Sequence, residues 1–503
     1  MAGIRLSITG AGSNGAPGNG NGNGGGKPSP TPPATSRFSG VITLGDSLID
    51  AGNALGLAEW YDGLPFQDLP EGAPTAELGY FEGRFTNCYT YADLVTNKYT
   101  GKPSQSIFPY GYEEPTFGIR IAPFEPEPKD NNLNWGYGGA QIRGGGPIPN
   151  LYDQTDAMRD AADGKYDPGA LFLITMGGND VRELAPATGA VTDAATAATR
   201  LQKAADALLG EIGEMVARGA SHFVITGLPD VGLIPRYDTD FDGVLDPTPG
   251  SELDRARTAT QYSQILDDLI REQVVPAARA LGAEVTYVPL ADVLDDQGNV
   301  IEQGALDRIL PTLADLHGIA LQDLQDNLLQ YQDTVFFDRI HPTAQVHALV
   351  GSLIHATLEG MEWIEGRPLA SDAIDLSFAG SIDTAGEVDT FTVSLRRGDT
   401  WTFEMLGMST LGIDGSLADP LMEILDPRGK AISEFQPGSG EDSGLGFDAL
   451  LTFTAGRSGD YAIRASATGS LTGDYVIHGA MAEPVAGTSL RLFVNDSSLL
   501  TVG

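Results

Sequence analysis

The chain has 503 residues, of which 41% are hydrophobic, and this is enough for two folded domains with separate cores. Its 30 basic and 68 acidic residues give a net charge of −38, which argues against nucleic acid and anionic membrane surfaces as partners. The single cysteine, Cys88, excludes an internal disulfide.

The first segment, residues 1–37, consists mostly of Gly, Asn, Pro, Ser and Ala. This composition cannot bury enough apolar surface to offset the loss of chain entropy, so we expect a disordered tail. Its first ten residues lack the apolar stretch of a cleaved signal peptide. No run in the chain reaches the roughly 20 apolar residues that cross a bilayer, so no transmembrane segment is expected.

Strands and helices alternate in the next segment, residues 38–366. Short apolar runs predict parallel strands at 41–45, 132–136, 170–176, 222–227 and 284–288. Apolar residues at helical spacing predict helices at 191–218, 252–281 and 342–359. Because helices between parallel strands require right-handed crossovers, we expect an α/β fold: a three-layer α/β/α domain with a doubly wound parallel sheet.

Residues 367–482 change to alternating apolar and polar residues with Gly, Asp and Pro turns, which predicts an all-β sandwich. The expected strands lie at 388–395, 400–406, 421–425, 450–454, 460–465 and 474–478. The remaining tail, residues 483–503, has no clear partner in the sequence and is expected to fray or to pair with the sandwich.

Ser47 follows the first expected strand, in the sequence Gly45-Asp46-Ser47-Leu48. A strand that enters a Gly-x-Ser turn exposes the hydroxyl at the carboxyl edge of the sheet, where open α/β folds build their sites. A serine alone is inert, but Asp338 and His341 near the end of the same domain supply a base and a group that orients it. The three residue types therefore predict nucleophilic acyl chemistry.

Two glycine-containing blocks follow other expected strands, Asn134 to Ala140 and Gly177-Gly178-Asn179-Asp180. Taken singly, each block is an ordinary turn, and Asp338 with His341 and His347 could instead contribute to a metal site. Taken together and in this order at strand ends, the blocks favour a hydrolase over these structural alternatives.

With these blocks in place, the region from residue 38 to about 362 resembles the SGNH/GDSL hydrolases, in particular the branch of phospholipase, lecithinase and haemolysin-like esterases. The resemblance implies a flavodoxin-like sheet and a catalytic triad. In it Ser47 is the nucleophile, His341 the general base and then acid, and Asp338 the residue that orients the imidazole. Gly83 to Asn87 and Tyr91 to Leu94 also resemble a segment of this family.

The resemblance further implies an oxyanion hole formed by the Ser47 N–H, the Gly139 N–H and the Asn179 side-chain amide. Glycine allows the main chain to approach the substrate oxygen, and a neutral amide donates without competing for the proton. Gly136 stands where alanine is usual in the family, which leaves Gly138 open as the alternative to Gly139.

An acidic loop is inserted after Leu228-Pro229-Asp230. Its carboxylates Asp238, Asp240, Asp242 and Asp246 alternate around Gly243, as in the calcium loops that the segment resembles. We expect either a structural Ca²⁺ site or an ordinary acidic surface loop. The pattern lacks a glutamate at its twelfth position, so a metal would need ligands from elsewhere.

The expected function is therefore a serine esterase or lipase that hydrolyses carboxylic esters through an acyl-enzyme, with no cofactor for catalysis. The alternatives are a phospholipase or acyltransferase on lipid substrates, and a non-catalytic surface-binding protein on the same fold. The expected partner is a small-molecule or lipid ester. Aromatic residues in the loops before the glycine block, Tyr80 among them, are candidates for an acyl cleft.

The sandwich resembles the bacterial pre-peptidase C-terminal domain, through Gly380 to Asp383, Val388 to Phe391 and Gly459-Asp460-Tyr461. Such domains accompany secreted enzymes, which implies a surface or polymer contact through the sandwich. Without a recognisable signal peptide, we expect secretion through a type I exporter, with residues 483–503 as the candidate signal. A cytoplasmic location is the alternative.

Overall fold

The computed structural model describes two compact units, one made mainly of Arg37–Glu365 and the other mainly of Gly366–Leu411 and Gly415–Gly503. The described residues are 2–5, 37–64, 67–110, 113–114, 119–120, 130–144, 146–295, 297–363, 368–412, 416–432, 444–482 and 490–493. No helix among them is both long enough and apolar enough to span a membrane.

The first unit is built on a six-stranded sheet in the order β3-β6-β2-β7-β8-β9, in which every pair of neighbours is parallel. All five residues of the central strand β7 are buried, which explains why the strands read as continuous apolar runs. The strands are β2 (Val41–Gly45), β3 (Gln105–Ser106), β6 (Leu133–Asn134), β7 (Leu171–Thr175), β8 (His222–Thr226) and β9 (Glu284–Val288).

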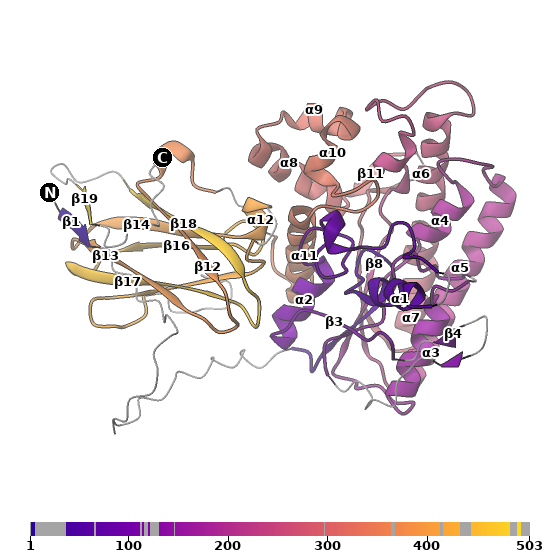
Figure 1. The fold of residues 1–503 in the computed structure, drawn as a ribbon, viewed down its shortest axis with the longest axis horizontal. Helices are drawn as coiled ribbons and strands as arrows, with labels where there is room; N and C mark the ends of the chain where they lie inside the picture. Colours follow the sequence, from indigo (N-terminus) through magenta and orange to yellow (C-terminus); the bar gives the residue numbers. More distant parts are fainter. Residues whose placement is uncertain are drawn as a thin grey trace. The chain divides into compact units, whose positions relative to one another are not determined.

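Helices cover both faces of this sheet, with α2, α8 and α11 on one side and α3 to α7 on the other (Figure 1). The α/β class and the parallel sheet predicted from sequence are confirmed. The longer helices are α1 (Asn53–Asp62), α2 (Tyr91–Thr100), α3 (Leu151–Ala161), α4 (Gly178–Leu184), α5 (Ala194–Ala217), α6 (Glu252–Leu269), α7 (Val275–Ala280), α8 (Ala305–His317) and α11 (Ala344–Glu359).

Short elements complete this unit. They are the turns of 3₁₀-helix η1 (Ala76–Leu78), η2 (Val231–Leu233), η3 (Pro235–Tyr237) and η5 (Leu328–Tyr331), the helices α9 (Leu321–Asp326) and α10 (Gln332–Val335), and the hairpin strands β4 (Glu113–Glu114), β5 (Ile119–Arg120), β10 (Val293–Leu294) and β11 (Val300–Glu302).

The single helix predicted at 252–281 is divided. A turn of π-helix, η4 (Ile270–Val274), separates α6 from α7, whose second residue is Pro276. Proline cannot donate a backbone hydrogen bond, and a π-turn is one way in which a helix accommodates such a break without ending. The buried residues continue through all three pieces, so the amphipathic pattern reads as one helix.

The second unit contains two antiparallel sheets, in the orders β12-β18-β14-β16 and β13-β17-β15. Alternate residues face a core that includes Trp401, Phe403, Phe447, Tyr461 and Tyr475. The strands are β12 (Leu376–Ile382), β13 (Asp389–Leu395), β14 (Thr400–Leu406), β15 (Pro420–Leu425), β16 (Ala449–Thr454), β17 (Gly459–Ala467) and β18 (Gly473–Met481), and two short helices are η6 (Ser371–Ala373) and α12 (Met408–Leu411).

Two segments predicted as tails contain one strand each. Strand β1 (Ala2–Arg5) pairs in parallel with β19 (Leu490–Phe493). Ala2–Arg5 carries Ile4 and lacks the glycine and asparagine repeats that dominate the rest of residues 1–37. The remainder of residues 1–37 before Arg37, on which the prediction of disorder rested, lies outside the described residues.

Candidate active site

The turn after β2 holds Ser47 in a fixed position. The Asp46 N–H donates to the Thr175 carbonyl oxygen at 3.2 Å, and the Asp46 carboxylate accepts the Leu48 N–H at 3.1 Å. Any Cβ at Gly45 would collide with the same Thr175 carbonyl oxygen, so only glycine lets β2 pass β7 at this point. Ser47 emerges 7% exposed, where the parallel strands end.

The structure brings Ser47, His341 and Asp338 into one hydrogen-bonded chain. Ser47 Oγ lies 2.8 Å from His341 Nε2, and His341 Nδ1 lies 2.7 Å from Asp338 Oδ2. The Asp338 carboxylate also accepts the backbone N–H groups of Ile340 at 2.6 Å and His341 at 2.7 Å. These bonds fix the loop on which both residues stand.

The charge of Asp338 determines which atom donates and which accepts in the contacts between Asp338, His341 and Ser47. Burial opposes ionisation of Asp338, but its hydrogen bond and Coulomb attraction to His341 outweigh the burial and lower its pKa to about 2. An ionised carboxylate can only accept, so the proton between the two residues belongs to Nδ1 of the imidazole. In the neutral imidazole, Nε2 is then left with a lone pair that can accept the Ser47 hydroxyl proton.

A second side-chain donor to Asp338 was not identified from the sequence. The Tyr80 hydroxyl donates to Asp338 Oδ2 at 2.7 Å. The Phe85 ring lies against His341, with ring centroids 4.8 Å apart. In the sequence, Tyr80 is only one of several aromatic loop residues, because Asp338, the residue it contacts, lies 258 positions away.

The glycine block lies against the Ser47 turn. The Tyr137 N–H donates to the Gly45 carbonyl oxygen at 3.1 Å, and the Gly138 N–H donates to Asp50 Oδ2 at 2.7 Å. Gly139 adopts φ +83, and its N–H has no hydrogen-bond partner among the described residues. Since Asp50 occupies the Gly138 N–H, Gly139 is the member of the pair with a donor available to a ligand.

Asn179 lies beside this block, at the start of α4. Its amide donates to the Ala140 carbonyl oxygen at 2.9 Å, and its side-chain oxygen accepts Arg182 Nη1 at 2.9 Å. Asp180, the next residue, accepts the Ile142 N–H at 2.9 Å. The Gly177-Gly178-Asn179-Asp180 block of the sequence is therefore attached to the residues that follow the glycine turn.

Asp50 and two asparagines hold these pieces together. Asp50 accepts the N–H groups of Gly52, Asn53 and Ala54 at the start of α1, besides that of Gly138. Burial raises the pKa of Asp50 to about 6, against the lowering effect of these four bonds. The Asn53 amide donates to the carbonyl oxygens of Asn134 and Gly136, at 2.8 and 2.7 Å.

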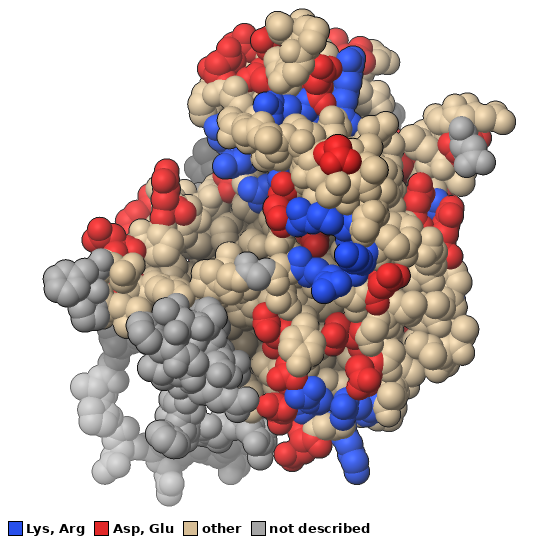
Figure 2. Space-filling view, turned by 90° about the vertical axis from the view of Figure 1, so that its right-hand side faces the viewer, with Lys and Arg blue, Asp and Glu red and all other residues tan. Residues whose placement is uncertain are grey.

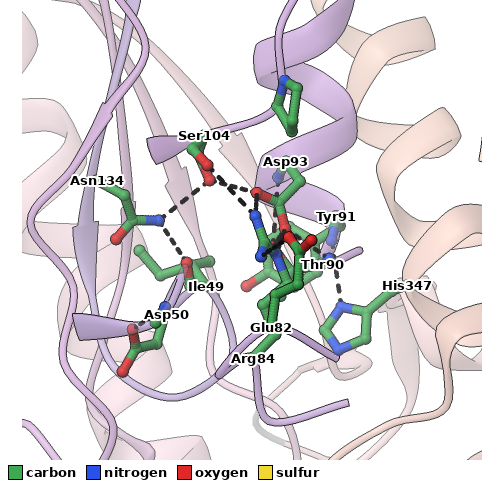
Figure 3. Close-up of polar contacts among 12 residues, drawn as sticks. Ile49, Asp50, Glu82, Arg84, Thr90, Tyr91, Asp93, Ser104, Asn134 and His347 are labelled. Carbon is green, nitrogen blue, oxygen red and sulfur yellow. Dashed lines mark hydrogen bonds and ion pairs between the residues drawn. The ribbon is translucent and has the colours of Figure 1, made fainter. Parts of the chain in front are cut away.

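Figure 3 shows the neighbouring part of this network, in which Asn134 donates to the Ile49 carbonyl oxygen at 2.5 Å and to Ser104 at 3.3 Å. The same view contains a buried ion pair, in which Arg84 Nε lies 2.8 Å from Asp93. Burial opposes the Asp93 charge, but Arg84 overcomes it and lowers the Asp93 pKa. The family-like segment from Gly83 to Leu94 thus contains a structural anchor.

The loop that carries His341 is tethered to the start of α2. Thr86 Oγ1 donates to the Pro342 carbonyl oxygen at 3.0 Å, and the Asn87 side-chain oxygen accepts the Ala344 N–H at 2.9 Å. Cys88, the next residue, is buried. These contacts position the His341 imidazole from a distant part of the sequence, since Thr86 and Pro342 are 256 residues apart.

His347 takes no part in a metal cluster with Asp338 and His341. Its Nδ1 accepts the Tyr91 N–H at 3.2 Å, and burial lowers its pKa to about 3, so the ring stays neutral. Among the described residues, the only group of three or more candidate metal ligands is Asp238, Asp240 and Glu252.

That group lies in the acidic loop, where one carboxylate oxygen from each residue falls within 4.8 Å of the others. Glu252, in the first turn of α6, is a ligand that the sequence pattern missed because it lies three residues beyond the twelfth position. Asp242 and Asp246 lie outside this group, although Asp246, Asp242 and the members Asp238 and Glu252 all accept N–H groups of the loop. Two of the four predicted carboxylates therefore belong to the cluster.

The sequence from residue 41 to residue 354 matches the family described as GDSL-like lipase/acylhydrolase. A comparison with curated proteins gives no match. Among solved structures, the propeptide form of the Bacillus licheniformis lipase BlEst2 is 10% identical, with a TM-score of 0.18, covering 90% of this chain and 77% of that one. A family GH115 4-O-methyl-α-glucuronidase is 9% identical, with a TM-score of 0.18, covering 89% and 82%. TM-scores this low do not indicate a shared fold. The family assignment therefore comes from the sequence match alone.

Proposed function

Because the chain belongs to the GDSL-like lipase/acylhydrolase family, we propose that it is a serine hydrolase that cleaves carboxylic esters through an acyl-enzyme. The observation that carries the proposal is the chain of contacts from Ser47 Oγ to His341 Nε2 at 2.8 Å and from His341 Nδ1 to Asp338 at 2.7 Å. A hydroxyl, a base and an orienting carboxylate in this order activate a serine.

In the first half of the proposed reaction, Ser47 Oγ attacks the ester carbonyl carbon and its proton passes to His341 Nε2. The carbonyl oxygen becomes negative, and the N–H groups of Ser47 and Gly139 with the Asn179 amide stabilise it. The bond to the alcohol oxygen then breaks. His341 returns the proton to that oxygen, so the alcohol leaves and Ser47 carries the acyl group.

In the second half, His341 takes a proton from water, and the resulting hydroxide attacks the acyl carbon. The bond to Ser47 Oγ breaks as His341 protonates the serine oxygen, which releases the carboxylic acid and restores the enzyme. Asp338, ionised because its pKa is about 2, stabilises the imidazolium formed in each half. Each step is a proton transfer or an acyl transfer, and none changes an oxidation state.

The substitution Ser47→Ala tests the proposal. It removes the nucleophile, so kcat/KM on a short-chain 4-nitrophenyl ester should fall by at least about 10⁴-fold. The matched control is Ser39→Ala, because Ser39 is an exposed serine that bonds Asp167 at 2.7 Å near the start of the same strand. Equal rates for wild type and Ser47→Ala would leave the non-catalytic alternative.

We further propose that the acidic loop holds a structural Ca²⁺ ion between Asp238, Asp240 and Glu252. Three carboxylates within 4.8 Å form the type of oxygen cluster that calcium prefers, and the loop attaches to the His341 loop through Arg339. The ion would stabilise the loop and would take no part in the acyl transfer.

A further inference from the structure

A cavity of about 290 Å³ is lined by three arginines, Arg182 on α4, Arg236 in η3 and Arg339 between Asp338 and His341. Thr188, Tyr237 and Thr239 complete its polar lining. The protein has 30 basic and 68 acidic residues. Three arginines around one cavity therefore make this part of a strongly acidic protein locally basic. Figure 2 shows a face on which basic side chains gather among acidic ones.

These three arginines form no ion pair with a carboxylate among the described residues, whereas Arg84, Arg200 and other arginines of the same unit do. Arg182 donates to the neutral Asn179 amide oxygen, and Arg339 donates to main-chain carbonyl oxygens, including that of Asp238 at 2.5 Å. Arg339 Nε is buried and has no hydrogen-bond partner. The guanidinium carbon of Arg339 lies 4.0 Å from the centroid of the Phe241 ring, and an ordered water or a bound anion can supply the acceptor that Nε lacks.

The arginines also repel one another. Burial and then the positive charge of Arg236 lower the pKa of Arg182, while smaller effects of Tyr237, Asp46 and Asp338 raise it. Tyr237 cannot supply a neutralising negative charge, because burial raises its pKa to about 12 and its hydroxyl donates to the Ala185 carbonyl oxygen at 2.5 Å. An anion in the cavity would relieve this repulsion.

The cavity adjoins the candidate active site through bonded contacts. Arg182 holds the oxygen of Asn179, and the Arg236 N–H donates to the Arg339 carbonyl oxygen at 2.9 Å. Arg339 lies between Asp338 and His341 in the loop that places the imidazole. Ser47 and His341 do not line the cavity themselves, so a charged substituent of an ester bound at Ser47 would have to extend beyond the two side chains to reach these arginines.

We propose that the cavity binds an anionic group of the substrate, a carboxylate or a phosphate carried by the same ester that Ser47 cleaves. Guanidinium groups suit such anions, because their planar donors match two oxygens at once. This proposal rests on the esterase function proposed above, and it adds the substrate class: esters with a negative charge in the acyl part or in the alcohol part.

Two matched substrate pairs test both positions of the charge. On the acyl side, mono-4-nitrophenyl glutarate is compared with 4-nitrophenyl valerate, which has the same number of acyl carbons and no second carboxylate. On the alcohol side, lysophosphatidic acid is compared with the monoacylglycerol of the same acyl chain. The wild-type enzyme should have the higher kcat/KM on the anionic member of at least one pair.

The variants Arg236→Gln and Arg339→Gln identify the cause of that preference. Losing one charge-assisted contact should lower the ratio of anionic to neutral kcat/KM by about tenfold. Because both esters are measured on the same variant, a loss of folded protein cancels in the ratio. The control is Arg218→Gln, an arginine that bonds Glu214 at 3.3 Å and does not line the cavity.

Equal kcat/KM within both pairs for the wild type would overturn the anion proposal, as would a preference that Arg236→Gln and Arg339→Gln both retain. Either result leaves the esterase function intact provided that the neutral esters are turned over by the wild type and not by Ser47→Ala. Absence of turnover on every ester would instead contradict the esterase function itself.

Discussion

Asp338 serves two purposes through its two oxygens. Oδ1 accepts main-chain N–H groups of its own loop, and Oδ2 receives the imidazole Nδ1 and the Tyr80 hydroxyl. The first oxygen thus fixes where the histidine stands, and the second fixes which of its nitrogens carries the proton. The three-residue spacing of Asp338 and His341 makes both possible on one loop.

At the same scale, Asn179 is expected to act on the reaction and little on substrate binding. The substitution Asn179→Ala removes the side-chain amide, whose hydrogen bond to the substrate oxygen becomes stronger as that oxygen becomes negative. We therefore expect kcat to fall by about 10²–10³-fold with a small change in KM. Steady-state kinetics on a 4-nitrophenyl ester measure both constants. A rise in KM with kcat preserved would contradict the oxyanion role.

Asp46 makes the stability of the protein depend on pH. Burial raises its pKa from 3.8 to about 7, although the Leu48 N–H opposes the shift. The folded state therefore binds a proton that the unfolded state releases, and the Asp46 contribution to stability declines as pH rises from about 4 to 7. The substitution Asp46→Asn keeps an acceptor for Leu48 and removes the charge.

Asp46→Asn should consequently be more stable than wild type at pH 8, by about 4 kcal/mol, with the difference shrinking toward pH 4. Urea denaturation at several pH values measures this difference. The control is Asp206→Asn, because Asp206 is an exposed carboxylate on α5. A difference between Asp46→Asn and wild type that is the same at every pH would refute the assignment.

The sequence named the residues proposed for the chemistry, and it also named Tyr80 and the segment from Gly83 to Asn87, but not the contacts by which these hold the His341 loop. Ser47, Asn179, Asp338 and His341 stand in short motifs, and each motif follows a strand or precedes a helix that can be read from the pattern. Tyr80, Thr86 and Asn87 hold the His341 loop through contacts that cross more than 250 residues of chain, as the 258-residue and 256-residue separations illustrate. Contacts of this range leave no local signal.

At the scale of elements, the predicted strands of the α/β sheet are present, and a sixth was missed. Strand β3 has two residues and a mostly exposed pattern, so it carries no apolar run. It is ordered by β6, whose Leu133 and Asn134 pair with it. Helix α11 begins at Ala344 and not at Pro342, because the Thr343 side chain accepts the Val346 N–H and caps it.

The acidic loop should make the thermal stability of the protein depend on calcium. If Ca²⁺ joins Asp238, Asp240 and Glu252, adding it to chelator-treated protein should raise the melting temperature by several degrees, because binding to the folded state stabilises it. Asp240→Asn should abolish the rise. Differential scanning calorimetry measures it.

Asp246→Asn is the matched control for this prediction. Asp246 lies in the same loop, but its carboxylate accepts the Thr248 N–H and hydroxyl, outside the cluster. It should keep the calcium response. An equal response of Asp240→Asn and wild type, or none in wild type, would leave the loop as an ordinary acidic surface loop.

At the scale of the whole molecule, the residues of the candidate site all belong to the unit made mainly of Arg37–Glu365. Residues 37–363 alone should therefore fold and cleave a short 4-nitrophenyl ester with kcat/KM within about threefold of the full chain, since no sandwich residue is assigned a role in the chemistry. Circular dichroism and steady-state kinetics check this. A folded but inactive fragment would assign the sandwich a part in catalysis.

The separation of 294 positions between Ser47 and His341 has a consequence for biosynthesis. The serine leaves the ribosome early, but the histidine proposed to activate it follows only when most of the domain has been translated. On the proposed mechanism, chains that terminate before His341 therefore carry Ser47 without its base. Active hydrolase would be present in the producing cell only after the whole domain has been translated and folded.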